Sequence, residues 1–117
     1  MIERDEAYLK NILDCIHLIY GYTDGMSEPE FISHSMARDA VVRNFEIIGE
    51  ATKLISDSLR AEYNHISWKG MAGMWDKLIH NYMGGYFEII WKTINDILPS
   101  LEEEIENILE WTTSYAS

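Results

Sequence analysis

Apolar residues recur along most of the chain at the three- and four-residue spacing that places them on one face of a helix. The first such segment covers about residues 3–22, and acidic residues occupy its first turn, where the helix dipole favours them. A second helix is predicted from Ser27-Glu28-Pro29-Glu30, a sequence typical of a capping box with proline in the first turn, to about Ser33. The chain therefore begins with a long and a short helix.

A long helix is predicted over about residues 35–59. Its buried stripe comprises Ala40, Val41, Phe45, Ile48, Ala51, Thr52 and Ile55. Gly49 lies inside it, although glycine costs a helix about 1 kcal/mol relative to alanine. We therefore expect another helix to approach closely at Gly49.

Three further helices are predicted, over about residues 69–84, 86–98 and 101–109, with Pro99 interrupting between the last two. No segment shows the strict alternation of a half-buried strand, and no internal repeat or linker is present. The pattern predicts an all-α fold: one domain, residues 1–117, built as an up-and-down bundle of four to five helices.

The composition of the chain excludes several classes of function. The chain has 9 basic and 20 acidic residues, a formal net charge of −11, which argues against general binding of DNA or other nucleic acids. A single cysteine, Cys15, excludes an intrachain disulfide and fits a reducing cytoplasm. The first residues are too charged for a signal peptide, and no apolar run is long enough to span a membrane. We expect a cytoplasmic protein without membrane contact.

Two clusters of polar residues are candidate sites. Glu62 and His65 have the Glu-x-x-His spacing of carboxylate-bridged metal sites, but the pair falls in a connector and has no second copy, so we expect no metal. The residues Asp39, Arg43, Glu46 and Glu50 share a face of the long helix. They are either exposed ion pairs or, if Arg43 faces a cleft, part of a functional surface.

The tripeptide His80-Asn81-Tyr82 ends an apolar helix just before Gly84-Gly85. In a continuous helix His80 and Tyr82 would point about 200° apart, so they face one site only if the helix ends between them, and the two glycines favour such an end. Asp76, four residues earlier, is placed to orient the His80 ring. The alternative is a core histidine beside a packing tyrosine.

Two stretches carry a resemblance to a known family. The segment from Arg38 to Ala51, RDAVVRNFEIIGEA, resembles the second conserved block of HepT-like proteins, members of the HEPN superfamily. The segment from Trp68 to Tyr82, WKGMAGMWDKLIHNY, resembles the third block. The two blocks occur in the right order, and the resemblance extends over most of the chain.

The resemblance implies a HEPN-like helical fold and a two-fold homodimer whose motifs face one cleft. It implies a toxin of a prokaryotic toxin–antitoxin pair, an endoribonuclease that cuts RNA without metal through an Arg-x4-His-x-Tyr motif. The partner it implies is an MntA-like minimal nucleotidyltransferase antitoxin. That antitoxin uses ATP and Mg²⁺ to transfer AMP to the motif tyrosine, and the toxin itself has no cofactor.

Carried over by position, His80 and Tyr82 match the catalytic histidine and tyrosine, and Tyr82 is the implied AMP acceptor. Asp76 matches the polar residue that follows the motif arginine. Trp75 stands where that arginine is expected, which predicts impaired catalysis, because an indole has no charge and cannot grip a phosphate through two bonds. The chain is a naturally inactive member, a disabled variant, or an enzyme in which Lys77 or Arg43 supplies the cation. The alternative function is a non-catalytic helical module that binds a nucleotide or a nucleotidyltransferase.

Overall fold

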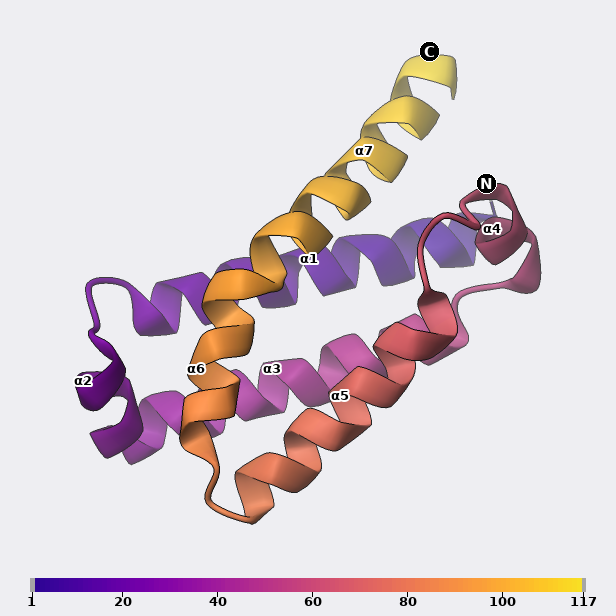
Figure 1. Ribbon diagram of the computed structural model, residues 1–117. Helices are drawn as coiled ribbons and strands as arrows, with labels where there is room; N and C mark the ends of the chain where they lie inside the picture. The colour runs from indigo at the N-terminus through magenta and orange to yellow at the C-terminus, as the bar shows by residue number, and fades with distance from the viewer. Residues whose placement is uncertain (1, 117) are drawn as a thin grey trace.

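The computed structural model describes residues 2–116, with side chains for residues 2–110. Throughout this part of the chain the regular elements are helices. They are α1 (Glu3–Thr23), α2 (Glu28–Ser33), α3 (Ser35–Leu54), α4 (Asp57–Glu62), α5 (Trp68–Met83), α6 (Phe87–Asp96) and α7 (Leu98–Ala116). Figure 1 shows α1 and α3 running antiparallel, α5 returning along α3, and α6 leading into α7, which crosses α1. The predicted all-α fold is confirmed, with four long helices connected by shorter ones.

The start of α2 has the predicted capping box. The Ser27 hydroxyl accepts a hydrogen bond from the Glu30 backbone N–H, and the Glu30 carboxylate accepts one from the Ser27 N–H. Two otherwise unpaired donors at the helix end are satisfied in this way.

The long helix predicted over residues 35–59 is instead two helices, α3 and α4. The chain becomes extended at Ile55 (φ −61°, ψ 135°), and the Ser56 hydroxyl then caps α4 by accepting a bond from the Leu59 N–H. The buried Asp5 carboxylate of α1 accepts bonds from the N–H and the hydroxyl of Ser56. The break therefore places a serine where it both caps a helix and holds the start of α1.

Pro99 does not separate the last two helices as predicted, because α6 ends at Asp96, before the proline. α7 begins at Leu98, so Pro99 lies in its first turn, where proline's missing N–H has no helical partner to lose. The last helix therefore starts earlier than the predicted residue 101.

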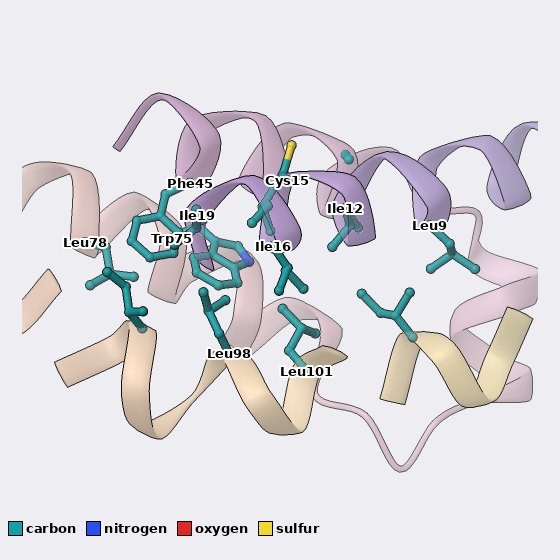
Figure 2. Close-up of a cluster of buried hydrophobic side chains, with 14 of the residues drawn as sticks. Leu9, Ile12, Cys15, Ile16, Ile19, Phe45, Trp75, Leu78, Leu98 and Leu101 are labelled. Carbon is teal, nitrogen blue, oxygen red and sulfur yellow. The ribbon is translucent and has the colours of Figure 1, made fainter. Parts of the chain in front are cut away.

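The core lies between α1, α3, α5 and α7 and is completed by side chains from α2 and α6. Its largest fully buried side chains are Trp75, Phe31, Phe45, Leu9, Ile12, Ile16, Ile19, Ile48, Ile90, Leu98, Ile105 and Ile108. Figure 2 shows the Trp75 ring among Phe45, Ile16, Ile19 and Leu98. A Cβ added at Gly49 would lie 3.1 Å from the Trp75 Cβ, so the predicted close approach at this glycine is confirmed and its partner is α5.

Candidate active site

The helix α5 continues through both His80 and Tyr82, contrary to the expectation that it would end between them. It ends at Met83, after which Gly84 retains a helical conformation and Gly85 adopts a left-handed one with φ +86°. Consecutive helical residues are rotated by about 100°, so His80 and Tyr82 point in different directions within one chain. His80 is exposed, whereas Tyr82 is half-buried.

Tyr82 lies in a polar corner formed by α3, α5 and α6. Its hydroxyl donates a hydrogen bond to the Asp39 carboxylate of α3, and its ring packs on Phe87 of α6 with a centroid separation of 5.4 Å. The Arg38 guanidinium also packs on Phe87, with its central carbon 4.1 Å from the centre of the ring. The motif tyrosine is thus held by two consecutive residues from the start of α3 and one from the start of α6.

The surroundings of Tyr82 keep its hydroxyl protonated. Burial raises the pKa of Tyr82 above its usual range, the hydrogen bond to Asp39 and the charge of Asp39 raise that pKa further, and Arg38 opposes both. At neutral pH this side chain is therefore a hydrogen-bond donor rather than a base.

The Arg38 guanidinium is held in place by neutral partners. Its Nη1 donates to the Ile32 carbonyl at the end of α2, and its Nε is buried without a hydrogen-bond partner among the described residues. No carboxylate oxygen within residues 2–110 lies at ion-pair distance from it. Its charge is consequently not neutralised by an ion pair.

Trp75 does not join this corner. Its side chain is fully buried and stacks on Phe45 at a ring-centroid separation of 5.4 Å. The indole Nε1 is buried with no hydrogen-bond partner in the described part of the chain. The position that the resemblance assigns to the motif arginine therefore belongs to the core in this protein.

The three supporting residues expected from the sequence lie away from Tyr82 or bind elsewhere. Asp76 accepts a hydrogen bond from Lys53 of α3 at 2.9 Å, a contact to another helix rather than to the His80 ring. Arg43 is exposed and pairs with Glu46 at 3.4 Å, as the exposed-ion-pair interpretation predicts. Lys77 is exposed.

A groove of about 540 Å³ is lined by residues of α1, α3 and α5. Its lining includes Arg43, Asp76, Ile47, Leu54 and Ile79. Leu54 is 54% exposed, so apolar surface is open to solvent on this face.

Sequence reasoning identified Tyr82 but missed Arg38 and Asp39 as its neighbours. Both belong to the block that carries the family resemblance, yet nothing in their local spacing shows that the start of α3 meets the end of α5. For Arg38 one signal existed, because it lies three residues before Val41 and so continues the predicted buried stripe with a charged residue.

The Glu-x-x-His pair does not form a cluster in the structure. His65 instead contacts Glu104 of α7 at 3.2 Å. Among the described side chains, one group has the composition and spacing of metal ligands: His17 of α1 with Glu102 and Glu106 of α7, all within 4.8 Å of one another. These residues lie too far apart in the sequence for spacing to have indicated them.

The helical fold and the motif at the end of α5 define a class of protein. A sequence model of the family described as ribonuclease HepT-like matches residues 12–108, and the chain belongs to this family. It is 40% identical over 111 residues to a "putative RNase" of Methanocaldococcus jannaschii, covering 94% of this chain and 92% of that protein. It is 38% identical over 101 residues to a "probable ribonuclease HepT" of Thermococcus cleftensis, covering 86% and 92%.

A further relative from Methanocaldococcus jannaschii is described as "gamma-glutamylcyclotransferase and putative RNase". The identity is 43% over 105 residues, which is 90% of this chain but 47% of that longer protein. No solved structure matches the chain. None of the described helices combines the length and apolar character needed to cross a bilayer.

Proposed function

We propose that this chain is the toxin of a prokaryotic toxin–antitoxin pair and cuts RNA without a metal. The observation that carries the proposal is the corner at the end of α5, where the Tyr82 hydroxyl and the Arg38 guanidinium lie together and the exposed His80 lies two residues earlier on the same helix. Family membership and relatives described as ribonucleases support the same class of reaction.

Cleavage of RNA without a metal has three requirements. The 2′-oxygen of the RNA must lose its proton as it attacks phosphorus, the charge on the phosphate oxygens must be stabilised, and the departing 5′-oxygen must gain a proton. His80 suits proton transfer near neutral pH. Tyr82, kept protonated by its surroundings, suits donation of a hydrogen bond to a phosphate oxygen.

A two-fold homodimer is part of the proposal. Because His80 and Tyr82 diverge within one chain, a second copy is needed to bring a further histidine opposite each tyrosine and so to provide both an acid and a base. The groove along α3, with the exposed Leu54 and the lining residues Ile47 and Ile79, offers apolar surface for such a contact.

Silencing by an MntA-like nucleotidyltransferase is also proposed. The Tyr82 oxygen would attack the α-phosphorus of ATP, the bond to pyrophosphate would break, and the phenolic proton would pass to a base. Asp39 already accepts that proton in a hydrogen bond, so it is the base at hand. The adduct adds bulk and negative charge at the corner, which opposes RNA binding.

A second candidate function is a non-catalytic module that binds a nucleotide or a nucleotidyltransferase. The burial of Trp75 favours it, because the guanidinium that the motif normally supplies at this position is missing. Both candidates use the same corner, and they differ in whether RNA is cut.

The deciding experiment incubates the purified chain with total RNA in EDTA. Cleavage is expected, and His80→Ala should lower its rate by about 10²–10⁴-fold because a general acid–base group is lost. The matched control is His65→Ala, which removes an exposed histidine paired with Glu104 and should leave the rate within about twofold. Absence of cleavage, or equal cleavage by the His80 variant, would reject the nuclease and favour the binding module.

A further inference from the structure

We propose that Arg38, together with the Tyr82 hydroxyl, forms a binding site for a phosphate oxyanion and takes the role of the guanidinium that position 75 lacks. The inference rests on the proposed function, since it names the group that would hold the RNA phosphate. It assigns this role to α3 rather than to α5, and to neither Lys77 nor Arg43.

The first support is the state of the Arg38 guanidinium. Its position is fixed by the Ile32 carbonyl and by the Phe87 ring, while its Nε has no acceptor within the described residues. Because the Nε is already enclosed by protein, an incoming anion would bind the Nη nitrogens, where one donor is used by the Ile32 carbonyl. A guanidinium also presents its donors in the planar fork that matches two phosphate oxygens.

Two other arginines of the chain differ from Arg38, because carbonyl or carboxylate groups already accept their hydrogen bonds. Arg60 donates to the carbonyls of Thr52, Lys53 and Ile55 at the end of α3, which uses its donors to close that helix. Arg43 is exposed and pairs with Glu46. Arg38 has neither a full set of carbonyl acceptors nor a carboxylate.

The second support is the charge of the chain as a whole. At a net charge of −11 the protein repels a polyanion, so RNA binding needs a local cation that is not already neutralised. Arg38 lies in the first turn of α3, where the positive end of the helix dipole adds to its charge. The neighbouring Tyr82 supplies a neutral donor at the same place.

Asp39 should weaken phosphate binding at this site. Tyr82 has one proton to donate and gives it to Asp39, so an incoming phosphate must take that bond over. The Asp39 carboxylate also repels the anion. Removing its charge should therefore strengthen phosphate binding, whereas removing Arg38 should weaken it.

A phosphate at this site belongs either to an RNA backbone or to a free mononucleotide. Two probes separate these sources. One is a fluorescent single-stranded RNA with 2′-O-methyl groups throughout, which cannot be cut by attack of its own 2′-oxygen and whose binding is followed by anisotropy. The other is AMP, whose binding is followed by calorimetry. Both are applied to the wild-type chain and to variants whose folding is checked by circular dichroism.

Arg38→Gln should weaken binding of one of the two probes by at least about tenfold, and Asp39→Asn should strengthen it. For the RNA, Arg38→Gln should also lower the slope of log affinity against log salt by about 0.7, which a merely structural change would not do. Arg4→Gln is the matched control, because Arg4 is an exposed arginine in the first turn of α1, and it should change neither affinity by more than about twofold.

Each result decides the question. An Arg38-sensitive RNA affinity supports the site and identifies a backbone phosphate, and an Arg38-sensitive AMP affinity alone identifies a mononucleotide. Affinities for both probes that are unchanged in Arg38→Gln overturn the proposal, even if the wild-type chain cuts RNA. If Arg38→Gln fails to fold, Asp39→Asn decides, since unchanged affinity for both probes then overturns it. Phosphate binding without any RNA cleavage would reject the nuclease but retain the site.

Discussion

The middle and the end of α5 use aromatic side chains for opposite purposes. In the middle, Trp75 is fully buried, stacks on Phe45 and faces Gly49, where α3 and α5 approach closely. At the end, Tyr82 is half-buried and its hydroxyl joins a corner with a cation and a carboxylate. One helix thus passes from packing to polar chemistry within two turns.

A residue at a motif position therefore need not lie in the site. Residues 75 and 80 are five apart, which in a regular helix is a rotation of about 140°. Trp75 therefore faces the core while His80 faces solvent. A tryptophan is tolerated at position 75 because this side of α5 is covered by other helices.

Substitution of Trp75 should have the largest effect on the stability of the protein. Trp75→Ala should lower the free energy of unfolding by about 3–5 kcal/mol because a large cavity is left behind. Trp75→Arg should also destabilise, because it places a charge in an apolar position. Urea denaturation measures both, and Trp91→Ala, at a half-buried position, should cost less. A Trp75→Arg protein as stable as wild type would show that position 75 faces a polar surface.

Gly49 tests the same interface from α3. Gly49→Val should lower the free energy of unfolding by about 1–3 kcal/mol, because its side chain meets Trp75 where even a Cβ would lie at 3.1 Å. Gly73→Ala is the control, since a Cβ added at this helical glycine meets nothing within 4 Å. It should stabilise by about 0.5–1 kcal/mol. Equal effects of the two substitutions would mean that α3 and α5 are not in tight contact.

Titration of Tyr82 tests its contacts with Asp39 and Arg38 in the polar corner. Asp39→Asn should lower the pKa of Tyr82 toward the usual tyrosine range, and Arg38→Gln should raise it. The signal is the ultraviolet absorbance of tyrosinate, taken as the difference from a Tyr82→Phe protein with the same second substitution. Shifts of the same sign in both variants would contradict the corner as described.

The same shift has a consequence for stability. Because the folded-state pKa of Tyr82 is raised, its contribution is fully present below the unfolded pKa of about 10 and is lost as pH rises through the folded value. Tyr82→Phe should therefore be less sensitive than wild type to unfolding at alkaline pH. Thermal melts at neutral and alkaline pH measure this difference.

The local sequence pattern predicted most of the helices but not the contacts between segments that are distant in the sequence. The start of α2 followed from Ser27 and Glu30 because a capping box is built from neighbours in sequence. The end of α3 was missed because the serine that caps α4 follows an apolar run that continues the helical spacing. The corner at Tyr82 was found only in part, since Asp39 lies 43 residues away and pairing over that distance depends on how α3 meets α5.

The contact between Asp5 and Ser56 should couple the opening of two segments that lie far apart in the sequence. It joins the first turn of α1 to the junction of α3 and α4 through two hydrogen bonds to a buried carboxylate. Neither segment can fray without releasing the other, so in amide hydrogen exchange they should open as one cooperative unit. The start of α1 would then be protected well beyond the level of an ordinary helix end.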